Sequence, residues 1–226
     1  MMALKSPLSS AFVGAAAAGL LLLGVCLSPS VSLAQSGSKP EPEKTDPKTP
    51  AEIGKALSKT PQTADEKTKV LSDLYAYLAT AEDEESAKPI AEAIERLWSQ
   101  SGSDTITLLM DRSSTALSAK NPELALKLLD SVVALAPDYA EGFNRRAYIR
   151  FTQNNVEAAV GDLRRVLALE PNHFKALDGL GQIWREHGNK RGALSVFKHL
   201  LEVHPYWPGA KQAVEELSRE VDGQGI

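Results

Sequence analysis

The sequence predicts an all-α fold in which antiparallel helix pairs stack into a solenoid. Prolines recur at a constant interval of 34 residues, at Pro137, Pro171 and Pro205, and each closes a helix-like run. Alanines recur at the same interval, at Ala125, Ala159 and Ala193. A turn signal divides each interval into two runs: Lys120-Asn121-Pro122, Asn154-Asn155 and Gly188-Asn189. Self-similarity at a fixed period of this length indicates one supersecondary unit stacked on copies of itself.

The chain begins with a segment typical of an exported protein. Lys5 is the only charged residue before Lys39, and residues 11–27 form an apolar run of 17 residues. With the small residue Ala34, this pattern predicts a signal peptide over residues 1–34 that is cleaved after Ala34. The alternative is an uncleaved membrane anchor, although the run is shorter than the roughly 20 residues that a span needs.

The only cysteine of the chain, Cys26, lies inside this segment. Leu23-Gly24-Val25-Cys26 resembles a bacterial lipobox in having leucine three residues before the cysteine, but Val25 stands where a lipobox has a small residue. We therefore do not expect lipidation at Cys26. Once the segment is removed, the sequence has no cysteine for a disulfide, for thiol catalysis or for zinc ligation.

A polar segment and a helix pair precede the repeats. Residues 35–64 are rich in Ser, Lys, Pro, Glu and Thr, and such a composition predicts a disordered linker. Residues 65–105 carry two apolar faces at helical spacing, which predict an N-terminal helix pair: Val70, Leu71, Leu74, Tyr77 and Leu78, then Ile90, Ala93, Ile94, Leu97 and Trp98. We interpret the pair as a degenerate repeat or a cap, because terminal units of solenoids are often atypical.

The repeated region contains a recognisable pattern. In its last unit, Leu177-x2-Leu180-Gly181-x2-Trp184 is followed by Ala193-x3-Phe197 and then by Pro205. This spacing resembles the tetratricopeptide repeat, whose pattern is W-x2-L-G-x2-Y, then A-x3-F, then P. The resemblance covers residues 106–205 well and residues 72–105 weakly. It implies three units (106–139, 140–173 and 174–205) in a right-handed superhelix, closed by a capping helix at residues 206–222.

Several residues of the repeats have structural interpretations. Gly181, Ala193 and Ala159 are small where the two helices of a unit approach each other, so large side chains would overpack these contacts. Arg146 occupies a slot that usually holds leucine, and Asp162 stands at the matching place on the opposing helix. Some members of the family place an arginine and an acid in this way, so we interpret Arg146 and Asp162 as a structural ion pair.

The resemblance also implies a binding surface, because the first helices of successive units line a concave groove that typically holds a peptide. Mapped by repeat position, the lining would consist of Thr107, Met110, Ser114 and Leu117, of Glu141, Asn144, Arg145, Tyr148 and Thr152, and of Lys175, Asp178, Gln182 and Arg185. One variant of the family clamps a carboxylate with Lys, Asn and Arg. Here Lys175 is at a comparable slot, but Met110, Ser114 and Gly179 replace other clamp residues, so the clamp is not expected to be complete.

Composition and spacing argue against other functions. The chain has 25 basic and 29 acidic residues, a net charge of −4 and no basic block, so we expect neither nucleic acid nor anionic membrane surfaces as partners. The four histidines, His173, His187, His199 and His204, lack metal-ligand spacing, and we expect no metal site, no cofactor and no enzymatic activity.

The sequence therefore predicts a noncatalytic adaptor that binds a protein or peptide in its groove. Its resemblance to exported bacterial tetratricopeptide proteins places it in the periplasm, without membrane contact after signal cleavage. Two alternatives stay open. One is a membrane-tethered assembly scaffold that retains residues 11–27, and the other is an accessory subunit of an envelope enzyme complex.

Overall fold

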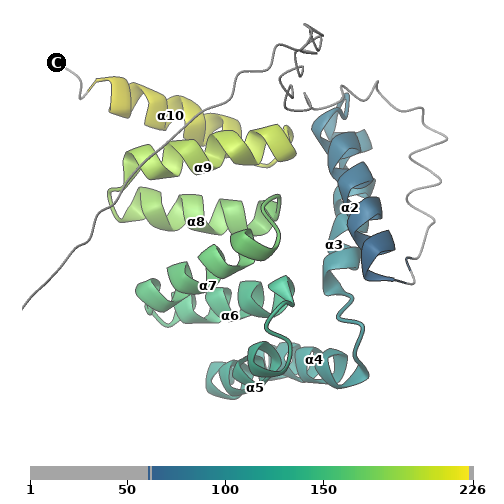
Figure 1. Ribbon diagram of the computed structural model, residues 1–226. Helices are drawn as coiled ribbons and strands as arrows, with labels where there is room; N and C mark the ends of the chain where they lie inside the picture. Colours follow the sequence, from purple (N-terminus) through teal and green to yellow (C-terminus); the bar gives the residue numbers. More distant parts are fainter. Residues whose placement is uncertain (1–60, 62, 224–226) are drawn as a thin grey trace, which may run out of the picture. The chain divides into compact units, whose positions relative to one another are not determined.

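A computed structural model describes residue 61 and residues 63–223, and their regular structure is entirely helical (Figure 1). The helices are α2 Ala64–Ala79, α3 Glu84–Ser99, α4 Asp104–Ser118, α5 Pro122–Leu135, α6 Ala140–Thr152, α7 Val156–Leu169, α8 Phe174–Glu186, α9 Lys190–Val203 and α10 Ala210–Asp222. The predicted signal peptide and nearly all of the predicted linker lie outside the described residues. Within the described ranges, each helix is too short or too polar to cross a membrane.

Three helix pairs, α4–α5, α6–α7 and α8–α9, stack in the order of the chain, and α10 packs on α9 (Figure 1). The predicted all-α solenoid of helix pairs is therefore confirmed. Apolar residues shared by the two helices of each pair form the core, with Ala125, Ala159 and Ala193 completely buried at the repeated position.

The turn inside each pair has the same two features, a residue in the left-handed region and an asparagine cap. Lys120, Asn154 and Gly188 have φ of 58°, 60° and 79°, so each reverses the chain in the left-handed region. The asparagine that follows caps the second helix: Asn121, Asn155 and Asn189 each accept a hydrogen bond from the backbone N–H three residues later. These features explain why Asn recurs where the sequence shows a turn signal.

The N-terminal pair α2–α3 is positioned differently from a stacked repeat unit. α2 packs against α9 and α3 against α6, so the pair crosses the edge where loops join one unit to the next (Figure 1). Each of these loops provides a contact, and so does the loop between α9 and α10. The Tyr139 hydroxyl donates to the Ser99 carbonyl at 2.9 Å, the Trp98 ring stacks on His173 with centroids 3.8 Å apart, and the Tyr206 hydroxyl donates to the Glu82 carbonyl.

The apolar faces of α2 and α3 explain this placement. Ile90, Ile94 and Trp98 share one continuous core with Phe174 and Phe197 of the third unit. Trp98 also donates its indole N–H to the Tyr75 hydroxyl at 3.0 Å, which locks α3 to α2. The bulky aromatic residues of the pair are therefore buried by the inter-unit loops and the third unit.

Gly181 offers a test of the contact between paired helices. A Cβ at Gly181 would lie 2.8–3.0 Å from the buried Phe197 ring, whereas a Cβ at Gly179 would lie 3.6 Å from Leu163, an ordinary contact. Both Gly→Ala changes gain up to about 1 kcal/mol of helix propensity. We expect Gly181→Ala to be less stable than Gly179→Ala by about 1–3 kcal/mol, because the ring cannot move away. Urea unfolding of both variants measures the difference, and equal stabilities would contradict the tight contact.

Candidate functional site

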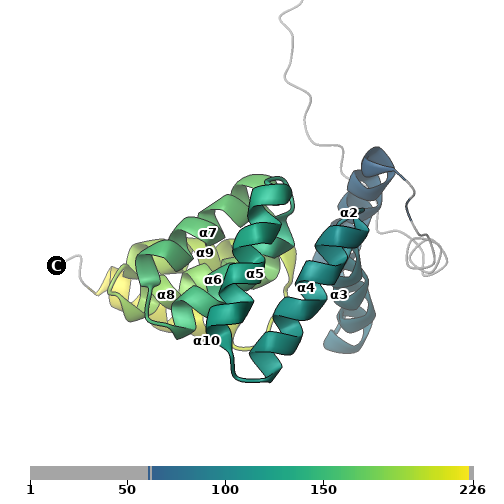
Figure 2. The ribbon, with the colours of Figure 1, turned by 90° about the horizontal axis from the view of Figure 1, so that it is seen from below.

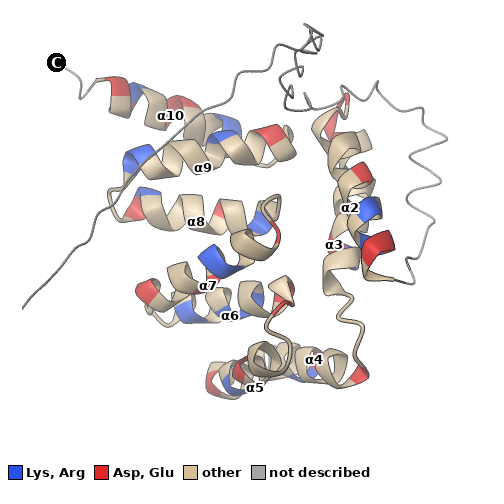
Figure 3. Ribbon diagram, in the orientation of Figure 1, with Lys and Arg blue, Asp and Glu red and all other residues tan. Residues whose placement is uncertain are grey.

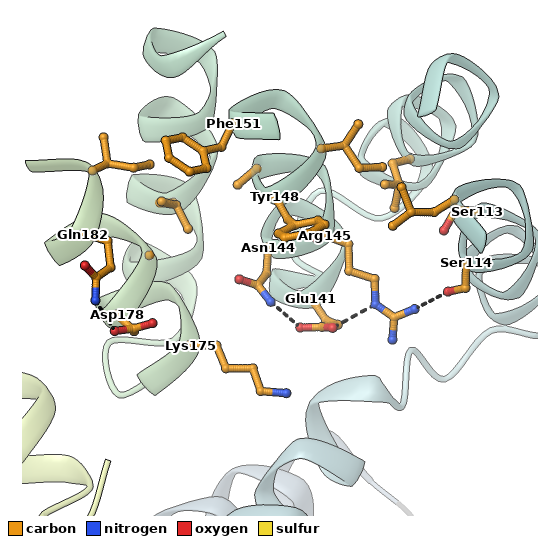
Figure 4. A pocket seen from close by; sticks show the side chains of 17 residues that line it. Ser113, Ser114, Glu141, Asn144, Arg145, Tyr148, Phe151, Lys175, Asp178 and Gln182 are labelled. Carbon is orange, nitrogen blue, oxygen red and sulfur yellow. Dashed lines mark hydrogen bonds and ion pairs between the residues drawn. The ribbon is translucent and has the colours of Figure 1, made fainter. Parts of the chain in front are cut away.

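The first helices of the three units, α4, α6 and α8, line a hollow of about 440 Å³ on one face of the array (Figure 4). Leu129 of α5 and Leu163 of α7 contribute to its floor from the second helices. We call this hollow the concave groove. It lies where the repeat register predicts the binding surface.

A hydrogen-bonded chain of polar side chains forms one side of the concave groove (Figure 4). Arg145 donates to the Glu141 carboxylate at 2.9 Å and to the Ser114 hydroxyl at 2.9 Å, so it bridges α6 and α4. Asn144 donates to the other oxygen of Glu141 at 3.0 Å. Because these groups hold one another, their positions are fixed before any ligand binds.

The polar side chains of α8 form a second group. Gln182 donates to Asp178 at 3.3 Å and accepts from Arg185 at 2.6 Å. Lys175 instead reaches out of the repeats, and its ammonium lies 2.6 Å from the Glu95 carboxylate of α3. The N-terminal pair therefore borders the concave groove at Lys175.

Apolar groups occupy the rest of the lining. Tyr148 lies over it with 60% of its surface exposed, which is unusual for so large an aromatic residue. The same hollow is lined by Leu117, Phe151, Leu163 and Ile183. The concave groove thus combines an apolar floor with a polar edge, a mixture typical of sites that hold protein segments.

Most of the predicted lining residues are brought together here. Those that line the hollow are Ser114, Leu117, Glu141, Asn144, Arg145, Tyr148, Lys175, Asp178 and Gln182. Met110 does not: it is only 4% exposed and packs in the core between α4 and α5. Three predicted residues lie outside the hollow: Thr107, Thr152 and Arg185. Arg185 nevertheless donates a hydrogen bond to Gln182, which lines the hollow.

Sequence reasoning missed the apolar floor, formed by Ala147, Ile149, Phe151, Leu163 and Ile183. Their signal in the sequence is the same helical periodicity that marks the core, so no pattern separates the two roles. Gly179 also lines the hollow, and its missing side chain leaves Leu163 accessible from α8.

Glu141 connects the concave groove to the interior. Its carboxylate lies 3.5 Å from Nε2 of His173, a ring that is fully buried. Burial alone would raise the pKa of Glu141, but the His173 ring and the Arg145 guanidinium outweigh burial and lower this pKa to about 2. Glu141 is therefore a fixed anionic anchor for Asn144 and Arg145.

The Arg146–Asp162 pair is not part of the lining of the concave groove. Arg146 donates to both oxygens of Asp162, at 2.9 and 2.7 Å, and Arg150 adds a further bond at 2.9 Å. Arg146 also donates to Asp130 of α5 at 2.8 Å. Burial acts to lower the pKa of Arg146, but bonding to Asp162 and Asp130 raises it overall. The network ties α6 to the second helices of two successive units.

Comparisons with known proteins identify the family. A tetratricopeptide repeat family model matches residues 110–173 and 144–210. The chain is also 37% identical over 153 residues to a TPR repeat-containing protein of Rhizobium etli, a match that covers 68% of this chain and 75% of that protein. The chain belongs to the tetratricopeptide repeat family. The resemblance seen in its sequence is thereby confirmed.

Two further matches are more distant in sequence. Human RNA polymerase II-associated protein 3 is 32% identical over 83 residues, which is 37% of this chain and 12% of that protein. A solved structure of the first tetratricopeptide domain of Spaghetti (RPAP3), bound to the HSP90 peptide SRMEEVD, superposes with a TM-score of 0.50 at 17% identity. That match covers 53% of this chain and 95% of the domain, and it shows a shared fold.

In the described part of the chain, His, Cys, Asp and Glu side chains form no group of three or more that could hold a metal ion. The titratable groups of the concave groove instead pair with one another or with α3. The arrangement is suited to recognition by hydrogen bonds and apolar contact.

The Arg146 network predicts unequal effects of its two acids. We expect Asp162→Asn to lower the free energy of unfolding by about 3 kcal/mol, because two largely buried guanidinium groups lose their counter-charge. Asp130 is half exposed, so Asp130→Asn should lower the free energy of unfolding by less than about 1 kcal/mol. Chemical denaturation of the two variants provides the comparison. Equal losses would show that burial does not set the strength of this network.

The low pKa of Glu141 predicts an acid-dependent stability. Because the folded pKa of about 2 lies below the value of about 4.3 in an unfolded chain, the stabilisation is complete above pH 5 and is lost as the pH falls toward 2. Over this pH range the free energy of unfolding of the wild type should fall by about 2–3 kcal/mol more than that of Glu141→Gln. Denaturation at each pH, with the exposed Glu157→Gln as control, tests this. A parallel pH dependence of wild type and Glu141→Gln would contradict it.

Proposed function

We propose that this protein is a noncatalytic interaction module that holds a segment of a partner protein in the concave groove. The observation that carries the proposal is the exposed Tyr148 above an apolar floor, beside polar groups already held in place. An isolated exposed aromatic on a surface has little meaning, but one that overhangs a hollow offers an apolar anchor with adjacent hydrogen-bonding groups.

The chemistry of the lining indicates how such a segment would bind. An apolar side chain of the partner would pack on Phe151, Leu163 and Ile183 beneath Tyr148. Asn144 and Gln182 would provide side-chain amides for the polar groups of the partner backbone. Because Arg145 and Asn144 are already fixed by Glu141, little side-chain entropy is lost on binding.

The family supports this proposal. Its fold can accommodate a peptide, as in the Spaghetti (RPAP3) domain that was solved with an HSP90 peptide. The two chains share only 17% identity, so the identity of that peptide is not transferred to this protein. What is carried over is the class of partner, a protein segment.

We further propose that the protein acts in the bacterial envelope. The support is the signal-like pattern of residues 1–34, with its basic start, apolar run and Ala34. The membrane-tethered scaffold is the second candidate, because the same apolar run would serve as an anchor. The mass of the protein isolated from its own cells distinguishes them: loss of residues 1–34 excludes the tether, and their retention excludes the released form.

A paired pull-down tests the groove. The groove variant combines Asn144→Ala, Arg145→Ala, Tyr148→Ala and Lys175→Ala. A control variant changes three exposed residues of the second helices, Glu157→Ala, Arg164→Ala and Lys198→Ala. Circular dichroism first establishes that both are folded. We expect the groove variant to lose at least one partner that wild type and the control retain. Identical partner lists for all three would place the working surface elsewhere.

A further inference from the structure

The first unit exposes an apolar stripe on the outer side of α5. Leu124 and Leu135 are 45% and 64% exposed, and Leu128 between them is half-buried. Their spacing of four and seven residues places all three on one face of the helix. Leu108 of α4, 54% exposed, is the other large exposed aliphatic residue of this unit outside the concave groove. Together these four residues define the end face.

The end face points away from the rest of the array. On α5, Val133 packs toward Gly142 of α6, and Asp130 binds Arg146 of α6, so the second unit lies on that side. The helical positions of Leu124, Leu128 and Leu135 are on the opposite side. Figure 2 looks onto this end and shows α4 and α5 in front of the other helices of the array.

The same positions are different in the later units. The residue that corresponds to Leu128 in the second unit, 34 residues later, is Asp162. Asp162 is buried and binds Arg146 and Arg150 where successive units meet. Leu108 corresponds to Gly142 and Ala176, both buried. The first unit therefore keeps large apolar side chains at positions that stacking covers elsewhere, while α2–α3, which could have covered them, packs on the inter-unit loops.

Charged residues beside the stripe indicate what covers it. Glu123 and Lys127 lie four residues apart on one flank of α5, and neither forms an ion pair with another described residue. When two copies of α5 meet antiparallel about a two-fold axis, the same flank of each helix faces its counterpart. Glu123 of each copy then lies opposite Lys127 of the other, with Leu124 and Leu128 at the crossing between them.

We propose that the end face is the interface of a symmetric dimer, in which α5 and α4 of one copy pack against α5 and α4 of a second copy. The interface is isologous, so the same leucines and the same charge pair serve both partners. The opposite end of the array is closed by α10, whose outer residues include Lys211, Glu215 and Arg219. Association is therefore head to head and closes at two copies.

Charge reversal at the end face tests this proposal. Glu123→Lys gives each copy two cations on the flank, and Lys127→Glu gives each copy two anions, so each variant repels itself. Mixed together, they restore opposite charges across the interface. By sedimentation equilibrium of the full chain, we expect wild type at twice the monomer mass, each variant alone at the monomer mass, and the equimolar mixture again at twice the monomer mass.

The control is Glu157→Lys, the same change at the equivalent position of the second unit, which is expected to leave the mass of the dimer unchanged. The triple variant Leu108→Lys, Leu124→Lys, Leu135→Lys is expected to be a folded monomer, because all three side chains are exposed. A monomeric wild type would overturn the proposal. So would an association that persists in both charge variants and in the triple variant, since it would use another surface.

Discussion

The stacking of Trp98 on His173 is the contact on which the other parts of the structure depend. His173 lies in the loop between the second and third units, and its Nδ1 accepts the Ala176 N–H that begins α8. Its other nitrogen faces Glu141, the anion that fixes Arg145 and Asn144 in the concave groove. One buried imidazole therefore joins the N-terminal pair, the third unit and the concave groove.

This arrangement fixes the shape of the concave groove. In a stack of repeats each unit contacts only its neighbours, so curvature can vary along the array. Here α2–α3 contacts both inter-unit loops, at Tyr139 and His173, and the loop between α9 and α10, at Tyr206. The lining helices keep their spacing, and Lys175 is held by Glu95 at the border of the concave groove. Charged residues of both signs are interspersed along the helices, which suits recognition by local contacts rather than by a general field (Figure 3).

The sequence predicts the three repeat units well, because each unit needs the same turn, the same helix cap and the same small residue at the same interval. A left-handed turn residue followed by an asparagine cap, and a small residue between paired helices, can be found by their interval alone. The position of α2–α3 could not be predicted in this way. Its apolar faces indicate two helices, but the surface that buries them depends on Trp98, Phe174 and Phe197, which are distant in the chain and share no periodicity.

The concave groove was predictable to a similar degree. Repeat position identifies Ser114, Asn144 and Arg145, because polar residues on the first helices seldom belong to the apolar core. It misplaces Met110, whose side chain turns into the core between α4 and α5. It also misses the pairing of Lys175 with Glu95, because that contact joins the repeats to a segment outside the repeat pattern.

Site-specific photo-crosslinking can show whether a partner segment occupies the concave groove beside Tyr148. A benzophenone amino acid would replace Tyr148 in one strain and the exposed Arg164 of the outer helix α7 in another. After irradiation of living cells, we expect a discrete covalent adduct of higher mass from position 148 that is absent from position 164. Adducts at position 164 alone, or the same adducts from both positions, would contradict it.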